Sequence, residues 1–182
     1  MNKLIVSVIG EDRPGILAAV SDGLYGNGCN IEDVSQTILQ SVFGALFIVS
    51  TAAETDSKQL QTNLANALSA LNLDIYVREK GFSAPQSFAA QPFVVTTLGP
   101  DQPGLVRGIT SVFSKYAVNV TNLKGVFKGG DDPGNNIMIF EVDVPAGTDL
   151  PVLRRELEQA ARQLALEINI QHRRIFETMN RI

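Results

Sequence analysis

The chain has 182 residues, 45% of them hydrophobic, and a formal net charge of −4. This acidic balance argues against direct nucleic-acid binding, and the only basic cluster, Arg173, Arg174 and Arg181, is interpreted as a solvated chain end. Without a long apolar run or a signal-peptide pattern, and with Cys29 as the only cysteine, we expect a cytoplasmic protein that has no membrane contact and no internal disulfide.

Residues 1–80 contain six segments whose apolar side chains recur with the period of a strand or a helix. Leu60, Leu64 and Leu68 recur at helical spacing, and Asp56 with Gln59 before them resembles a capping box that starts the helix. We expect strands at 3–10, 29–40, 44–53 and 73–79, with helices at 14–27 and 56–71.

Residues 92–182 repeat the same order of segments. Asp149 and Pro151 mark the start of the second helix, because aspartate caps helices and proline is tolerated in their first turn. The hydrophobic period is lost over residues 81–91, where small and polar residues predict a linker. We expect strands at 92–99, 118–128, 136–144 and 168–176, with helices at 103–116 and 149–166.

The two copies are related by a constant offset of 89 residues. The segment from Val6 to Ile16 returns from Val95 to Leu105, and both contain the turn motif Gly-x-Asp-x-Pro-Gly. The order βαββαβ with one-sided helices predicts an α+β fold of two ferredoxin-like domains, each an antiparallel sheet with two helices on one face. Domains this small bury little surface, so we expect a homo-oligomer.

The repeated turn is the candidate functional site. It joins a strand to a helix whose first backbone amides point outward and favour an anion such as an α-carboxylate. We expect Asp12 to cap the helix, Gly15 to permit close approach, and Asn30 or Asp12 to accept hydrogen bonds from a ligand ammonium group. The candidate ligand-binding residues are Asp12, Arg13, Pro14, Gly15, Ile16 and Asn30 in the first copy, and Asp101, Gln102, Pro103, Gly104, Leu105 and Asn119 in the second.

The same residues resemble a known family. Gly10-Glu-Asp-Arg-Pro-Gly-Ile16 and Gly28-Cys-Asn-Ile-Glu-Asp33, inside βαββαβ repeats, resemble the ACT domain. Two such copies with little else, covering residues 1–176, resemble the glycine cleavage system transcriptional repressor family. The second copy departs from the pattern, which makes the first copy the expected ligand site: Pro100 and Gln102 replace Glu11 and Arg13, and Thr121-Asn122 replaces Glu32-Asp33.

This resemblance implies a regulatory protein that is not an enzyme and needs no cofactor. Its ACT units would pair, and a small amino acid such as glycine or serine would bind at the interface between units. A repressor of this kind would act through a protein partner such as a DNA-binding transcription activator. Such a role fits an acidic chain without a helix-turn-helix pattern.

Other interpretations have weaker support. The element order also matches the RNA-recognition motif, but the basic-glycine pair that should lead its aromatic strand is absent at Phe43–Phe47. The carboxylates of Gly129–Asn136 lack the spacing of an EF-hand, so a loop is expected there. Cys29 and His172 offer no zinc site or histidine-dependent triad within one chain. A ligand-free interaction module, whose turns only start helices, and an enzyme with an unrecognised site stay as alternatives.

Overall fold

The computed structural model describes residues 2–52, 55–79, 81, 89–126 and 135–175. The chain divides into two compact units, Met1–Ala84 and Pro85–Ile182, called unit 1 and unit 2 below. Most of the expected linker at 81–91 lies outside the described residues. No helix in the described ranges combines the length and the hydropathy needed to span a bilayer.

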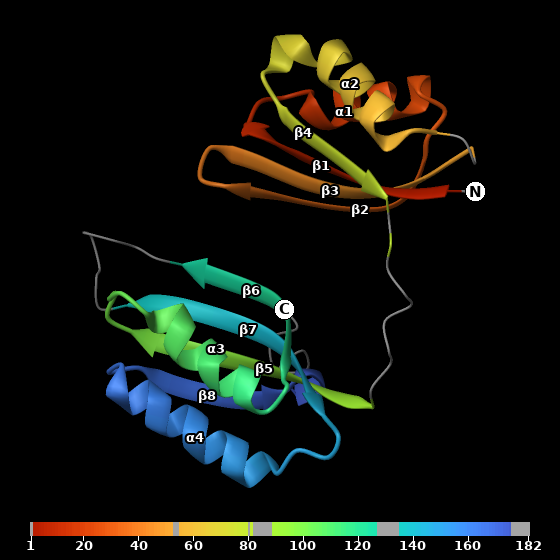
Figure 1. Ribbon diagram of the computed structural model, residues 1–182. Coiled ribbons are helices and arrows are strands. Elements are labelled where there is room, and N and C mark those ends of the chain that lie inside the picture. The colour runs from red at the N-terminus through yellow and green to blue at the C-terminus, as the bar shows by residue number, and fades with distance from the viewer. Residues whose placement is uncertain (1, 53–54, 80, 82–88, 127–134, 176–182) are drawn as a thin grey trace. The chain divides into compact units, whose positions relative to one another are not determined.

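Unit 1 has the predicted order βαββαβ. Its strands form one antiparallel sheet in the order β2-β3-β1-β4, with α1 and α2 on one face (Figure 1). A short 3-10 turn at Ser69–Leu71 leads from α2 into β4. The elements are β1 Asn2–Glu11, α1 Ile16–Gly26, β2 Asn30–Leu39, β3 Val42–Thr51, α2 Ser57–Ala67 and β4 Asp74–Glu79.

Unit 2 repeats this architecture. Its sheet has the order β6-β7-β5-β8, again antiparallel throughout, and α3 and α4 cover one face. The predicted fold class, two ferredoxin-like α+β domains, is therefore confirmed. The elements are β5 Ala90–Gly99, α3 Leu105–Lys115, β6 Asn119–Val126, β7 Asn136–Pro145, α4 Leu150–Gln163 and β8 Glu167–His172.

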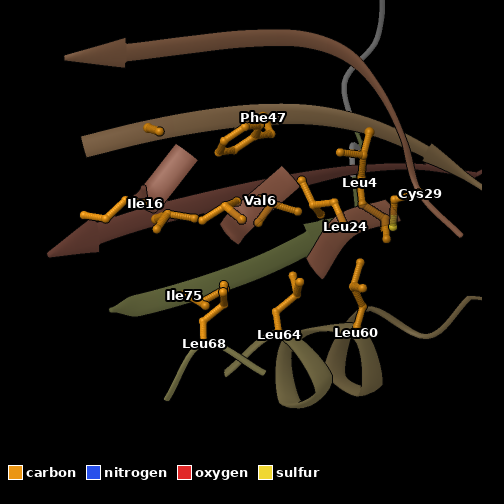
Figure 2. Packing of buried hydrophobic residues seen from close by; sticks show 14 of the residues in the cluster. Leu4, Val6, Ile16, Leu24, Cys29, Phe47, Leu60, Leu64, Leu68 and Ile75 are labelled. Carbon is orange, nitrogen blue, oxygen red and sulfur yellow. The ribbon is translucent and has the colours of Figure 1, made fainter. Parts of the chain in front are cut away.

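Each unit has its own hydrophobic core between the sheet and the two helices. In unit 1, alternate residues of the central strands, such as Val6 and Phe47, point at the helices and meet Leu24 and Leu64 (Figure 2). These four side chains are at most 1% exposed, which accounts for the one-sided patterns of both helices and strands. In unit 2 the core is centred on Phe113 and Phe140, whose rings meet edge to face at 5.5 Å.

The second helix of each unit begins at the predicted aspartate. The Asp56 carboxylate accepts a hydrogen bond from the Lys58 amide at 3.0 Å, and Asp149 accepts one from Val152 at 3.1 Å. Gln59 does not complete a capping box, because its side-chain amide donates to Asn63 instead. The first helix of each unit begins differently, as described below for the candidate site.

The two edges of each sheet are unequal. At the β4 edge, the Gln61 side chain accepts a hydrogen bond from the Val77 amide at 3.0 Å. At the β8 edge, Arg154 donates to the Ile170 carbonyl at 3.0 Å. The opposite edge strand of unit 1, β2, has all its residues exposed, and β6 is nearly as exposed in unit 2. Each sheet thus keeps one long edge open for pairing.

Both open-edge strands carry a β-bulge that the sequence patterns did not predict. The register shifts between Ile31 and Asp33 in unit 1 and between Val120 and Asn122 in unit 2. Each bulged residue bonds to another strand of its sheet: Glu32 reaches past β3 to pair with Lys3 of β1, and the Thr121 hydroxyl donates to the Glu141 carbonyl of the adjacent β7. The expected strands also end elsewhere: β3 begins two residues before the expected 44, and β8 ends at His172 rather than at 176.

We predict that Gly99→Ala destabilises unit 2. A Cβ at this position would lie 2.8 Å from the Ala165 carbonyl oxygen and 2.8 Å from Leu166, where β5 passes the loop before β8. Such overpacking costs about 1–3 kcal/mol, measurable by urea denaturation followed by circular dichroism. Gly147→Ala is the control, because a Cβ there meets no atom within 4 Å. Equal stability of the two variants would contradict the prediction.

Candidate functional site

The candidate site is the turn between β1 and α1 and its counterpart between β5 and α3. Gly15 has φ +93° and Gly104 has φ +92°, so each helix begins at a glycine in the left-handed region. A Cβ at Gly15 would meet no atom within 4 Å, which shows that glycine is required here for its backbone conformation and that the space beside it is open.

The start of α1 corrects the expected role of Asp12. The N-cap residue of α1 is Gly15, and no side chain in the described part of the chain caps the helix, so Asp12 does not act as its cap. The same holds for Asp101 at α3, where Gly104 is the N-cap residue. The first amides of both helices therefore lack a side-chain acceptor among the described residues, which makes them available to an anion.

A hydrogen bond ties the unit 1 turn to the neighbouring hairpin. The Asp12 amide donates to the Ser41 carbonyl at 2.8 Å, in the hairpin between β2 and β3. Residues 12–15 are exposed, while the Ile16 side chain anchors the helix in the core at 1% exposure. Arg13 makes a 3.6 Å ion pair with the exposed Glu11, so its guanidinium lies at the protein surface beside the turn.

Asn30 lies at the other end of unit 1. It pairs with Ser50, which is also the partner of Lys3 near the start of β1, whereas the turn follows Glu11 at the end of β1. With a strand rise of about 3.3 Å per residue, the two ends are roughly 25 Å apart. Within one unit the structure therefore does not bring Asn30 to the turn, which corrects the expected acceptor across from the helix start.

The direction of the chain explains this separation. The helix α1 runs back along the sheet after the turn, so β2 begins at the end of the sheet where β1 began. Asn119 in unit 2 is placed in the same way, because it pairs with Asp143, which also pairs with Pro92 near the start of β5. Both asparagine side chains are exposed.

Among the described residues, one side-chain contact distinguishes the turn of unit 2 from that of unit 1. The Gln102 side-chain amide donates to the Leu164 carbonyl at 2.6 Å, just after the end of α4. The corresponding residue in unit 1 is Arg13, which contacts only exposed Glu11 among the ion pairs of the described residues. Gln102 is thus engaged within its own unit, whereas the Arg13 guanidinium remains at the surface near an uncapped helix.

A charged cluster joins the two helices of unit 2. Lys115 donates to both carboxylate oxygens of Glu156 at 2.6 and 2.8 Å, and the Tyr116 hydroxyl donates at 2.7 Å. These bonds, from Lys115 first and then Tyr116, lower the pKa of Glu156, and the same carboxylate raises the pKa of Lys115. The corresponding helices of unit 1 are joined by Asn63 and Asn27 at 2.8 Å, so the cluster is a helix–helix contact.

Cys29 and His172, the one cysteine and the one histidine of the chain, each pack within their own unit. Burial raises the pKa of the Cys29 thiol, which keeps it protonated and poorly nucleophilic. His172 packs edge to face on Phe93, with ring centroids 5.3 Å apart. No group of three potential metal ligands occurs in the described ranges, and most of the Gly129–Asn136 segment lies outside them.

Comparisons with known proteins identify the repeated unit. The ACT domain family model matches residues 2–78 and 91–171. A UPF0237 protein of Methanopyrus kandleri is 37% identical over 81 residues, which are 44% of this chain and 90% of that protein. A UPF0237 protein of Streptococcus pneumoniae is 38% identical over 76 residues, which are 42% of this chain and 82% of that protein.

Two solved structures share the whole two-unit fold. An "unknown protein" from Galdieria sulphuraria aligns with a TM-score of 0.76 at 23% identity, over 94% of this chain and 98% of its own. A protein named "putative glycine cleavage system transcriptional repressor" aligns with a TM-score of 0.69 at 19% identity, over 93% of this chain and 96% of its own. At these identities the likeness shows the fold.

The chain belongs to the ACT domain family, with one ACT domain in each unit. The resemblance to the ACT domain is thus confirmed. The βαββαβ order of each unit, which an RNA-recognition motif shares, is here the order of an ACT domain. Membership of this family points to a regulatory, ligand-binding role rather than to catalysis.

We predict that the two turns differ in their contribution to stability. Gln102→Ala removes the half-buried hydrogen bond to Leu164 and leaves the Leu164 carbonyl without this donor. The free energy of unfolding should fall by about 0.5–1.5 kcal/mol. Arg13→Ala removes only an exposed ion pair and should change the free energy of unfolding by less than about 0.5 kcal/mol. Urea denaturation of both variants tests this contrast, and an equal or larger effect of Arg13→Ala would contradict it.

The charged cluster predicts a pH-dependent stability. Because the pKa of Glu156 is lowered in the folded protein, its stabilisation is present at neutral pH and is lost as the pH falls below its ordinary value of 4.5. Glu156→Gln should therefore lower the melting temperature slightly at pH 7, and this effect should become smaller as the pH falls below 4.5. Glu158→Gln, which removes the same charge outside any ion pair of the described residues, is the control for net charge.

Proposed function

We propose that this chain is a non-enzymatic, amino-acid-sensing regulator whose ligand carboxylate binds at the start of α1. The observation that carries the proposal is the uncapped beginning of this helix at the left-handed Gly15. An eleven-residue helix concentrates partial positive charge and unbonded amides at this end. An α-carboxylate would satisfy those donors without displacing a side chain of the protein.

The turn of unit 1 is better suited to this role than that of unit 2. Arg13 adds a positive charge at the surface beside the turn, and its partner Glu11 is 77% exposed, so their pairing is weak. The corresponding Gln102 is uncharged and donates to Leu164. We therefore assign the main ligand site to Asp12, Arg13, Pro14, Gly15 and Ile16, with the matching turn at Asp101, Pro103, Gly104 and Leu105 as a weaker or inactive copy.

The ammonium half of the site would come from Asn30 of a second copy of unit 1. The strand β2 is an open edge and can pair antiparallel with β2 of another chain. Full overlap of Asn30–Leu39 with itself places Asn30 opposite Leu39 of the second copy. Leu39 precedes the hairpin that holds Asp12 through Ser41, so this pairing would bring the two halves together.

This arrangement couples ligand binding to association. A ligand held by the turn of one copy and by Asn30 of the other would stabilise the paired state by as much as it prefers that state. The resemblance to the glycine cleavage system repressor family supports glycine or serine as the first ligands to test. It also supports a DNA-binding transcription activator as the protein that senses the change.

Calorimetric titration of the whole chain with each of the twenty amino acids tests the sensing role. We expect one small amino acid to bind, and Asn30→Ala to weaken its binding at least tenfold with an unchanged melting temperature, because Asn30 is exposed. Asn119→Ala, the matched change in unit 2, should have a smaller effect. The absence of heat for all twenty amino acids would favour the ligand-free interaction module, and turnover of any of them would favour an enzyme.

The proposed pairing has its own test. Val34→Lys with Ile38→Lys places charges on the open edge strand, where both side chains are about half exposed, and should disfavour pairing without unfolding unit 1. Analytical ultracentrifugation should show a smaller assembly, and the ligand affinity should fall together with it. Unchanged affinity in a fully dissociated variant would show that Asn30 does not act across two copies.

A further inference from the structure

Unit 2 contains a cavity that the proposed sensing site does not use. It has a volume of about 50 Å³ and lies between α4 and the sheet, at the end of the unit where α4 begins. Its walls are the apolar side chains of the core, including Phe93, Val142, Leu153 and Leu157. Arg154 is the one charged residue among those that line it.

We propose that this cavity binds a short branched aliphatic carboxylate, with its two terminal methyl groups inside and the carboxylate on Arg154. An engineered cavity of about 150 Å³ binds benzene, so a cavity of about 50 Å³ has room for roughly two groups of methyl size. At a third of that volume, the cavity is too small for an aromatic ring. Apolar walls offer water no hydrogen-bond partners, so such a cavity stays empty of water. An alkyl group in it gains van der Waals contacts with the walls.

Arg154 is placed to receive the charged end of such a ligand. One of its terminal nitrogens donates to the Ile170 carbonyl at 3.0 Å, which holds the guanidinium at the β8 edge beside the cavity. Arg154 takes part in no ion pair within the described residues, although Glu158 follows it by one helical turn. The remaining donors of a guanidinium can bind a carboxylate through two parallel hydrogen bonds.

Unit 1 supplies an internal comparison for this site. Gln61 follows its helix cap, Asp56, at the same spacing as Arg154 follows Asp149, and Val77 corresponds to Ile170. Gln61 contacts the same position of the edge strand without a charge and in the opposite direction, because its side-chain oxygen accepts from the Val77 amide at 3.0 Å. The edge contact therefore needs only a polar side chain, and the positive charge of Arg154 is an addition specific to unit 2.

Isovalerate is the probe for this cavity, and methyl chemical shifts of the whole chain are the readout. We expect saturable shifts at Leu153, Leu157 and Ile170 with a Kd on the order of 1 mM, as small ligands of this size allow. Acetate carries the charge without the branched alkyl group, and 3-methyl-1-butanol carries the alkyl group without the charge. Both should bind at least tenfold more weakly than isovalerate.

Two variants separate ligand binding from a gap in the packing. Arg154→Gln introduces the residue that unit 1 has at this position and should keep the melting temperature. It should weaken the binding of isovalerate at least tenfold and leave the binding of 3-methyl-1-butanol unchanged. Val142→Ile adds a methyl group into the cavity and should abolish the shifts for both compounds. If isovalerate shifts do not saturate, spread over the surface, or persist in both variants, the cavity is a packing gap and the proposal is wrong. None of these outcomes depends on the amino-acid site of unit 1.

Discussion

The burial of one sheet face by two short helices is the constraint on which the rest of this structure depends. Each unit has a single apolar layer between a four-stranded sheet and a helix pair, and the other sheet face is left to solvent or to partners. The connection from the second helix to the last strand passes close over the first strand of each sheet, which explains Gly99 beside the Ala165 carbonyl and Gly10 beside Leu73. The repeated motif therefore contains one glycine for close packing and another, Gly15, for backbone conformation.

The duplication preserved the packing and changed the polar contacts. Both cores are built from the same strand and helix positions, but the contact between the two helices is an amide pair at Asn27 and Asn63 in unit 1 and a charged cluster around Glu156 in unit 2. The turns and the helix-to-edge contacts changed as well. Polar contacts at the surface cost little to exchange, whereas a core change leaves a cavity or a clash.

Hydrophobic period, the caps at Asp56 and Asp149 and the constant offset were enough to predict the fold, because these signals are local and recur in both copies. The predicted position of Asn30 beside the turn was wrong, because the distance between them depends on the direction of the chain rather than on sequence spacing. A helix that returns along the sheet puts the start of the next strand at the far end, so the element order could have revealed this. The bulge at Glu32, the engagement of Gln102 and the cavity beside Arg154 depend on packing between distant segments, for which a single sequence offers no direct signal.

The unequal edges of the unit 1 sheet limit how far an assembly through β2 could extend. Two sheets joined along β2 would form a continuous eight-stranded sheet with β4 at both outer borders. Each border strand is only six residues long, and its Val77 amide is already bonded to Gln61. Further strands would find a short and partly occupied template, so growth through this sheet would end after one pairing.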